Sequence, residues 1–333
     1  MAMRQTDPLR GEFELIDRLF APLARGLAGA FELKDDVAAL PPRAGHEVVL
    51  KTDSTIEGVH FLSGDPPGSV AQKALRRALS DLAAKGAEPQ AYLLAIAFPE
   101  TTDNFWVERF VDGLARDQEQ FGVALAGGET TRTPGPLAVT VTLMGWVPEG
   151  QLVRRNGAKA GDEIWITGTI GDAAGGLALL RGEADATNSS LRERLVARFR
   201  VPEPRLAFGL ALRGLANAAI DISDGLLADL GHIADVSQVK IEIDAASVPI
   251  SPELHALWGD GQQTVLRAAS AGDDYEIAFS APPAAPEAIR SAAARLQTPV
   301  TRIGCVVEGA AAVSLHDSAG REIPVPRKGY MHF

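Results

Sequence analysis

Carboxylates recur in this chain where a polypeptide could hold a divalent cation. The segment KDDVAAL contains the acid pair Asp35-Asp36, and LKTDSTIEGVHF places Asp53 directly after a short apolar strand, where a loop is expected to begin. Hard cations such as Mg²⁺ take oxygen ligands, mainly carboxylates, and open α/β sheets bind ligands at the carboxyl ends of their strands. Both positions therefore predict metal ligands, although, taken alone, the acid pair is also what a solvated turn contains.

Two further acids stand in unusual surroundings. Asp81 lies inside the apolar helical segment ALSDLAAKGAEP, where a carboxylate is costly unless it is paired or metal-bound. Ser80 or Arg76 would be its partner in a purely structural role. Glu129 follows Gly128 in ALAGGETTRT, and paired glycines at the end of a strand let the backbone approach a ligand closely. The two segments predict another metal ligand and a corner that binds phosphate and metal.

The segment AIDISDGLLADLGHI places two acids at the junction of a strand and a helix. Asp221 ends the expected strand, and Ser223 or Asp224 begins the helix, whose first N–H groups and dipole favour anions. Helix capping alone does not explain Asp221 and Asp224 in the same corner. A second acid pair, Asp273-Asp274 in SAGDDYEIAF, precedes a later strand.

Two basic side chains could contact an anionic substrate. Arg155 stands in the polar segment PEGQLVRRNGAKAGD and could face a phosphate bidentately, or it could be an ordinary exposed arginine. His60 stands between Val59 and Phe61, where it is either a structural group or a ligand-binding one.

The motifs that the chain lacks narrow the chemistry. There is no G-x-x-x-x-G-K-[ST] segment, no kinase H-R-D or D-F-G motif, and no G-x-S-x-G segment, and GTIGDAAGG does not fit G-x-G-x-x-G. The six histidines are scattered and do not form a zinc pattern. What remains is phosphoryl transfer or a related ATP-dependent step, in which Mg²⁺ ions bridge carboxylates to phosphates.

Alternating helices and strands must position these residues. Apolar periodicity and helix-end signals predict helices over Gly11–Ala24, Ser69–Lys85, Asn104–Gln120, Ala173–Leu180, Leu191–Arg200, Arg205–Leu215 and Pro286–Leu296. Strands are expected over Val48–Leu50, Tyr92–Phe98, Leu137–Val147, Glu163–Thr167, Ala218–Ile222, Lys240–Ile243, Tyr275–Phe279 and Val300–Val306. This order predicts an α/β (α+β) protein. A polar, glycine-rich stretch at Pro148–Gly161 predicts a boundary, giving domains 1–148 and 149–333.

Length and charge support this interpretation and exclude others. The 333 residues favour two domains. The net charge of −11 argues against sequence-independent nucleic-acid binding, so a polyphosphate would need cations to mediate its binding. We expect no membrane segment, because the apolar stretches are too short. Cys305 is the only cysteine, which fits a cytoplasmic protein.

Taken together, the motifs resemble the thiamine-monophosphate kinase family. Nine segments occur in the order seen in that family: GEFELIDRLF, DDVAAL, KTDSTIEGVHF, LSDLAAKGA, GGETT, RNGAKAGD, AIDISDGL, GDDYE and KGYMHF. The resemblance implies an N-terminal domain whose sheet pairs across a homodimer into a barrel, and a C-terminal α/β domain. It also implies direct, Mg²⁺-assisted transfer of the γ-phosphate of ATP to thiamine monophosphate, with no phospho-enzyme and no catalytic side chain.

The resemblance further implies roles for individual residues. Metal ligands would be Asp36, Thr52, Asp53, Asp81, Asp221 and Asp224, with Glu129 where an aspartate is usual; ATP contacts would be Gly128, Glu129, Arg155 and Ser223, and substrate contacts His60 and Asp273. Lys34, Lys51 and Arg327 depart from the family pattern. The alternatives are therefore a sister ATP-dependent synthetase acting on another small substrate, or a nucleotide-binding homologue that has lost turnover.

Overall fold

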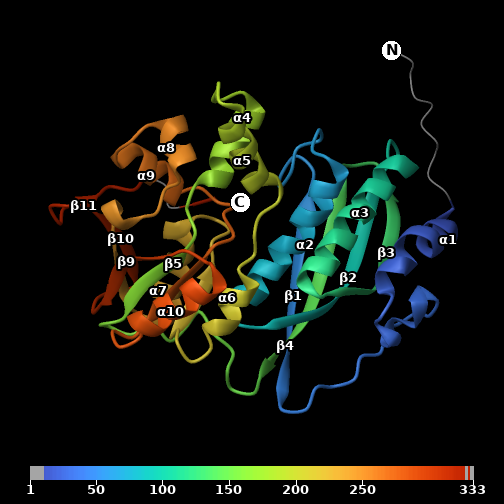
Figure 1. The fold of residues 1–333 in the computed structure, drawn as a ribbon, viewed down its shortest axis with the longest axis horizontal. Helices are drawn as coiled ribbons and strands as arrows, with labels where there is room; N and C mark the ends of the chain where they lie inside the picture. Colours follow the sequence, from blue (N-terminus) through green and yellow to red (C-terminus); the bar gives the residue numbers. More distant parts are fainter. Residues whose placement is uncertain (1–10, 327–328, 331–333) are drawn as a thin grey trace. The chain divides into compact units, whose positions relative to one another are not determined.

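The chain is divided into two compact units in a computed structural model that describes residues 11–326, 329 and 330. Unit 1 comprises the described residues up to Leu79 together with Glu88–Glu149, and unit 2 comprises Ser80–Ala87 and the described residues from Gly150 onward. Ser80–Ala87 therefore belongs to unit 2, although the segments on both sides of it in the sequence belong to unit 1. Figure 1 shows the elements of both units.

Unit 1 is built on a four-stranded sheet with the strand order β1-β4-β2-β3. Its strands are β1 (His46–Ile56), β2 (Glu88–Pro99), β3 (Ala124–Thr133) and β4 (Ala138–Pro148). β4 pairs antiparallel with β1 and β2, whereas β2 and β3 are parallel. β1 and β3 are thus the edge strands of this sheet.

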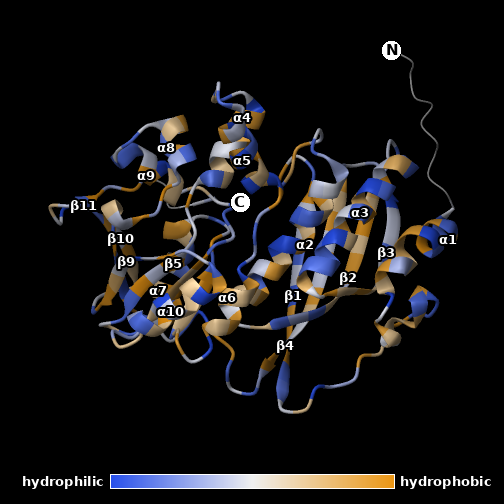
Figure 2. Cartoon of the chain, in the orientation of Figure 1, coloured by the Kyte–Doolittle hydropathy of each residue, from blue (hydrophilic) through white to orange (hydrophobic). Residues whose placement is uncertain are grey.

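Two long helices cover one face of this sheet. α2 (Pro67–Ala84) and α3 (Asn104–Phe121) carry both polar and apolar residues (Figure 2), as helices with one buried side do. Asp103 caps α3 by accepting a hydrogen bond from the Trp106 N–H. Arg76 of α2 and Asp117 of α3 form a buried ion pair at 2.8 Å. This ion pair therefore joins the two helices that cover the sheet.

The N-terminal part of unit 1 is helical but irregular. It contains α1 (Glu12–Leu15), a π-helical turn η1 (Ile16–Phe20) and the 3₁₀ turns η2 (Ala21–Ala24) and η3 (Ala28–Leu33). η2 and η3 lie against β3. The predicted helix over residues 11–24 is therefore a chain of short helical turns.

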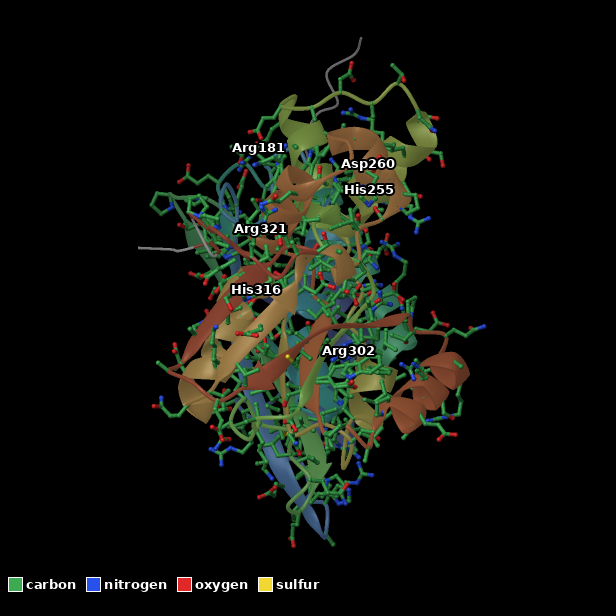
Figure 3. All side chains as sticks on the ribbon, turned by 90° about the vertical axis from the view of Figure 1, so that its left-hand side faces the viewer. Arg181, His255, Asp260, Arg302, His316 and Arg321 are labelled. Carbon is green, nitrogen blue, oxygen red and sulfur yellow. The ribbon has the colours of Figure 1, made fainter. Side chains whose placement is uncertain are left out.

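Unit 2 contains a seven-stranded sheet with the order β11-β10-β7-β9-β5-β8-β6. Its strands are β5 (Glu163–Thr167), β6 (Ala218–Asp221), β7 (Lys240–Asp244), β8 (Ile277–Ala281), β9 (Val300–Val307), β10 (Ala312–His316) and β11 (Glu322–Ile323). All neighbours pair antiparallel except β7 and β10. Arg302 of β9, labelled in Figure 3, forms an ion pair with Glu163 of the neighbouring strand β5 at 2.7 Å.

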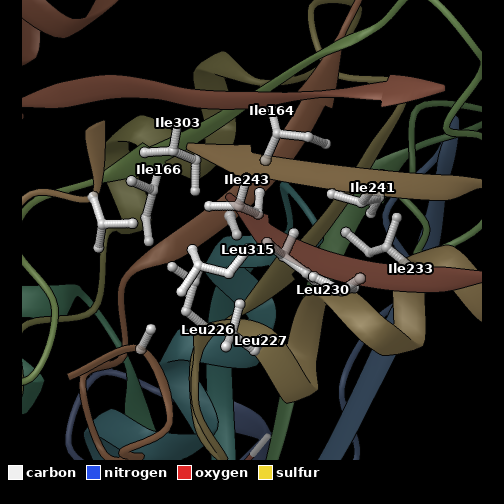
Figure 4. Close-up of a cluster of buried hydrophobic side chains, with 14 of the residues drawn as sticks. Ile164, Ile166, Leu226, Leu227, Leu230, Ile233, Ile241, Ile243, Ile303 and Leu315 are labelled. Atoms are coloured by element: carbon white, nitrogen blue, oxygen red, sulfur yellow. The ribbon is translucent and has the colours of Figure 1, made fainter. Parts of the chain in front are cut away.

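One helix of unit 2, α7 (Leu226–Ser237), packs on the sheet through a row of large apolar side chains. It buries Leu226, Leu227, Leu230 and Ile233 against isoleucines of β5, β7 and β9 (Figure 4). These side chains fix α7 on the sheet, and their complete burial stabilises the unit by roughly 1.5–3 kcal/mol each. The other helices are α4 (Asp172–Arg181), α5 (Ser189–Arg200), α6 (Leu206–Ala211), η4 (Ala245–Ser247), α8 (Pro252–Trp258), α9 (Gln262–Ala269) and α10 (Pro286–Leu296).

The predicted mixture of helices and strands is confirmed, and three local expectations are wrong. β1 runs on through Lys51-Thr52-Asp53 to Ile56, and the glycine pair before Glu129 lies inside β3. Threonine, which occurs twice in the polar stretch after Leu50, favours strands, and the pairing with β4 continues through this stretch to Ile56. The third correction concerns α7, which begins at Leu226 with Gly225 as its N-cap and not at Ser223 or Asp224.

Among the described residues, no helix is both long enough and apolar enough to cross a membrane.

Candidate functional site

A pocket of about 840 Å³ lies in unit 1 between the N-terminal segment and the sheet face that α2 and α3 leave open. Asp35, Asp36, Gly128 and Glu129 contribute to its lining. Gly128 is required here because a Cβ at this position would collide with the carbonyl oxygen of Leu94 on the neighbouring strand. The structure thus brings Asp36 to the same pocket as Gly128 and Glu129, which are far from it in the sequence.

Asp53 is in the middle of β1, opposite Val141 of β4. Side chains alternate along a strand, so Asp53 shares a face with Lys51 and Thr55, and Thr55 is completely buried under Arg77 of α2. The Lys51 ammonium lies 3.4 Å from the Asp53 carboxylate. A metal ion at Asp53 would therefore compete with a positive charge of the chain itself.

The side chains of Thr52 and His60 both form hydrogen bonds within unit 1. The Thr52 hydroxyl is 3.0 Å from the hydroxyl of Thr142 on β4, on the opposite face of β1 from Asp53. In the turn that follows β1, His60 Nδ1 accepts a hydrogen bond from the Ile56 N–H at 3.0 Å. Because Nδ1 is an acceptor, the proton of the neutral imidazole is on Nε2.

In unit 2, two segments that the sequence singled out lie side by side. Backbone hydrogen bonds join them: the Asp273 N–H donates to Ser223 O at 2.9 Å, and the Tyr275 N–H donates to Ile222 O at 2.8 Å. Asp273 has a φ of 71°, a conformation that costs energy in a non-glycine residue. Asp221 ends β6 immediately before this crossing and is 4% exposed. Asp221, Ser223, Asp224 and Asp273 therefore form one cluster.

Asp229 was not predicted from the sequence, although it organises this cluster. Its Oδ2 accepts hydrogen bonds from the N–H groups of Ser223, Asp224 and Gly225, each at 3.0 Å. Burial, with the nearby charge of Asp224, raises the pKa of Asp229 to about 7 although the three N–H groups act in the opposite direction. The signal was present in the sequence, because Asp229 lies on the apolar stripe formed by Leu226, Leu230 and Ile233.

Asp81 and Arg155 lie on the two segments that border β6 in unit 2. The last turn of α2 carries Asp81, and one turn later Lys85 Nζ donates to Ala219 O of β6 at 2.5 Å. The Ala219 N–H donates to Arg154 O at 3.0 Å, which places the neighbouring, exposed Arg155 along the same strand. Arg76, which the sequence suggested as a structural partner of Asp81, donates to Asp117 of α3.

A buried network of ion pairs and hydrogen bonds surrounds Glu276, which follows the acid pair Asp273-Asp274 in the sequence. Glu276 accepts hydrogen bonds from Arg205, Arg198 and Thr167. Burial alone would raise the pKa of Glu276, but the hydrogen bonds and charges of the two arginines hold it below the ordinary value. Burial raises the pKa of Asp274 well above its usual range, and this carboxylate accepts a hydrogen bond from the Gly171 N–H.

The C-terminal motif also reaches the cluster. The Tyr330 N–H donates to Asp224 O at 2.9 Å, and the Tyr330 side chain is 46% exposed. Arg327, which departs from the family pattern, lies outside the described residues. Tyr330 thus places an aromatic side chain next to the loop that contains Asp224.

The donor set of the cluster fits a hard divalent cation. Asp224, Asp229 and His232 each place one atom within 4.8 Å of the others. His232 is exposed, and Asp229 directs one oxygen to three N–H groups. We therefore regard Asp221 and Asp224 as the ligand candidates here, since carboxylate oxygens are what Mg²⁺ prefers.

Known proteins resemble the chain over nearly its whole length. Residues 34–147 match the family described as AIR synthase related protein, N-terminal domain, and residues 159–316 match AIR synthase related protein, C-terminal domain. The thiamine-monophosphate kinase of Caulobacter vibrioides is 43% identical over 326 residues, which are 96% of this chain and 90% of the relative. The Escherichia coli K12 enzyme of the same name is 39% identical and is covered to 98%.

Solved structures agree with these sequence relatives. The thiamine-monophosphate kinase of Stenotrophomonas maltophilia has a TM-score of 0.81 and 41% identity, covering 94% of this chain and 98% of its own. AaThiL complexed with AMPPCP and TMP has a TM-score of 0.77 and 32% identity, with 97% of each chain covered. The order of the acidic motifs, the fold of each unit and these similarities lead to one conclusion: the chain belongs to the thiamine-monophosphate kinase family.

Proposed function

We propose that the chain transfers the γ-phosphate of ATP directly to thiamine monophosphate, forming thiamine diphosphate and ADP. The observation that carries this proposal is the cluster of Asp221, Ser223, Asp224 and Asp273, which hydrogen bonds between two distant segments bring together. It is supported by family membership and by the complex of a 32% identical relative with AMPPCP and TMP.

The proposed reaction needs no base from the protein. A phosphate monoester has a second pKa of about 6, so the attacking oxygen of thiamine monophosphate is already deprotonated at neutral pH. That oxygen forms the new P–O bond while the bond between the γ-phosphorus and the β,γ-bridging oxygen breaks, and ADP leaves with the electron pair. The task of the protein is to position both phosphates and to neutralise their charge.

Carboxylates of both units are the candidates for binding Mg²⁺. In unit 2 we assign Asp221 and Asp224 as ligands, with Asp81 on the neighbouring segment; in unit 1 we assign Asp36, Asp53 and Glu129. Bound Mg²⁺ would neutralise the charge that develops on the phosphate oxygens. The Thr52 hydroxyl contacts the Thr142 hydroxyl. Thr52 as a metal ligand therefore stays a prediction. Gly128, Arg155 and Ser223 remain the proposed ATP contacts.

Substrate contacts are proposed at two places. In unit 1, His60 is the proposed contact, and the hydrogen bond from the Ile56 N–H to its Nδ1 orients the imidazole ring. In unit 2, Asp273 accepts a hydrogen bond from the Tyr275 hydroxyl at 2.8 Å, which fixes its carboxylate. That negative charge suits the cationic thiazolium of the substrate.

We also propose a homodimer in which the open face of the unit 1 sheet meets a second copy. Val48, Leu50 and Leu93 are 51%, 66% and 45% exposed on that face, and exposed apolar patches of this kind mark interaction surfaces. Pairing of two such sheets into a barrel would also protect the edge strands β1 and β3. The cytoplasm, where ATP is abundant, is the expected compartment.

The decisive experiment is an assay with purified protein, ATP, Mg²⁺ and thiamine monophosphate. We expect equimolar ADP, measured with a coupled enzyme, and thiamine diphosphate, measured by chromatography. Product from another phosphorylated or acyl substrate only would identify a sister synthetase. Binding of AMPPCP without any turnover would identify a nucleotide-binding homologue, and either result would refute the proposal.

A further inference from the structure

The start of α7 binds a carboxylate of the chain itself. Three consecutive backbone N–H groups, those of Ser223, Asp224 and Gly225, point at one oxygen of Asp229. Asp229 is 2% exposed and lies in the first turn of α7. Such N–H groups at a helix start are where a phosphate usually binds. Because Asp229 already occupies them, the nucleotide has to be recognised here through side chains and the cations they hold.

The remaining backbone atoms of the loop are engaged as well. Ile222 O and Ser223 O accept hydrogen bonds from Tyr275 and Asp273, and Asp224 O accepts one from Tyr330. The backbone N–H and C=O groups of the loop named above are thus all hydrogen-bonded within the chain. A ligand would therefore contact the loop through the side chains of Ser223 and Asp224.

The carboxylate of Asp229 is itself held in place by the hydrophobic core. Leu226, Leu227, Leu230 and Ile233, which surround it on α7, are each at most 1% exposed and pack on the sheet (Figure 4). A fixed helix therefore presents a fixed acceptor oxygen to the loop, and hydrogen bonds to an ionised acceptor are the stronger kind.

We propose that Asp229 is a positioning residue, whose carboxylate holds the Ser223–Gly225 loop in the conformation in which Asp224 meets the metal-bound nucleotide. This inference rests on the proposed function. Asp229 does not touch the reacting atoms and acts through the loop alone. Its loss should therefore weaken nucleotide and metal binding, and should leave the binding of thiamine monophosphate and the fold largely intact.

The test is Asp229→Asn, which removes the charge with little change of shape. We expect the KM for ATP and the dissociation constant for Mn²⁺ in the presence of AMPPCP, measured by electron paramagnetic resonance, to rise roughly tenfold, since charged hydrogen bonds are about twice as strong as neutral ones. The KM for thiamine monophosphate should change less than twofold. Asp229→Glu, which keeps the charge one methylene further out, should show a smaller loss.

Asp172→Asn is the matched control. Asp172 is also a buried aspartate of unit 2, 3% exposed, and accepts hydrogen bonds from Thr169 and Ser251. It should lower the melting temperature and leave the KM for ATP unchanged, as a merely structural carboxylate does.

The outcomes separate the inference from the proposed function. A wild-type protein that makes no thiamine diphosphate refutes the function, whatever the variants do. If the wild type is active, an unchanged KM for ATP and unchanged Mn²⁺ affinity in Asp229→Asn overturn the inference. Equal rises in both KM values, or failure of both Asp229 variants to fold, would also overturn it, because the carboxylate would then serve stability alone.

Discussion

Two lysines, Lys34 and Lys51, place positive charge near the proposed metal ligands of unit 1. Lys34 Nζ is 3.2 Å from Glu32 Oε2, so its charge is paired outside the acid pair. Lys51 instead pairs with Asp53, a proposed metal ligand, at 3.4 Å. Of the two lysines that depart from the family pattern, Lys51 is therefore the one expected to affect metal binding.

Replacing Lys51 with serine should strengthen metal binding. Without the ammonium, Asp53 is released for Mg²⁺, and the half-saturating Mg²⁺ concentration should fall about two- to fivefold, as expected for a partly exposed ion pair of up to about 1 kcal/mol. Titration of activity with Mg²⁺, and of Mn²⁺ binding by resonance, measures this. Lys34→Ser is the control and should change neither. Weaker metal binding in Lys51→Ser would show that the lysine helps to hold the nucleotide.

Replacing Asp221 tests whether the acidic cluster of unit 2 is needed for catalysis. Asp221→Asn keeps the shape of a side chain that is only 4% exposed and removes the charge of a proposed ligand. We expect kcat to fall on the order of 10³-fold, since a bound metal supplies several kcal/mol to such a transfer. Asp235→Asn, at an exposed position of the neighbouring helix α7, should be as active as the wild type. Loss of the folded state in Asp221→Asn, seen by circular dichroism, would mean that this carboxylate is structural.

The site could be predicted from the sequence only in part, for reasons visible at single residues. Asp221 and Asp224 were found because a carboxylate beside a strand end has few structural explanations. Asp53 was found as a ligand candidate but placed in a loop, because the sequence does not show that β4 pairs along the whole of β1. Asp229 was overlooked, although the argument that flagged Asp81, a charge on an apolar stripe, applied to it equally.

At the scale of elements, local patterns found long helices and buried strands and overlooked short ones. α10 spans Pro286–Leu296, as predicted. β11 was not predicted because it has only two residues. β10 was overlooked although, with five residues, it is as long as the predicted strands β5 and β7. α8 and α9, which have seven and eight residues, were not predicted either, and their stability comes from packing more than from propensity.

The network around Glu276 joins four elements and predicts how unit 2 responds to acid. Arg198 is on α5, Arg205 caps α6, Thr167 ends β5, and Glu276 precedes β8. The pKa of Glu276 is lower in the folded state than in the unfolded chain. Its stabilising contribution is therefore present above the unfolded pKa and is lost as the pH falls through the folded pKa.

Glu276→Gln tests this link. At pH 7 the unfolding free energy should fall by about 3–5 kcal/mol, because two largely buried arginines lose their partner. Below the unfolded pKa of glutamate, the variant should lose less stability per pH unit than the wild type. Denaturant melts at several pH values measure both effects. Glu183→Gln, at an exposed ion pair with Arg181 (Figure 3), should be indistinguishable from the wild type. Parallel pH profiles for Glu276→Gln and the wild type would contradict the prediction.

At the scale of the whole molecule, an acidic protein is expected to bind two phosphorylated substrates. The net charge of −11 repels phosphorylated substrates at long range. Mg²⁺ ions held by the carboxylates would offset this repulsion at the site. Neither unit alone carries all the proposed ligands, because Asp36, Asp53 and Glu129 belong to unit 1 and Asp81, Asp221 and Asp224 to unit 2. We therefore expect the activity to require both units.

The open face of the unit 1 sheet makes the last prediction, on oligomeric state. Leu50→Glu would place a charge in the proposed barrel, where its desolvation is unfavourable. We expect the wild type to have the mass of a dimer in chromatography with light scattering, and the variant to have the mass of one chain while keeping its circular dichroism. Val236→Glu, at an apolar side chain of α7 that is 54% exposed, is the matched control and should stay dimeric. A monomeric wild type at micromolar concentration, or a dimeric Leu50→Glu protein, would show that this face is not the interface.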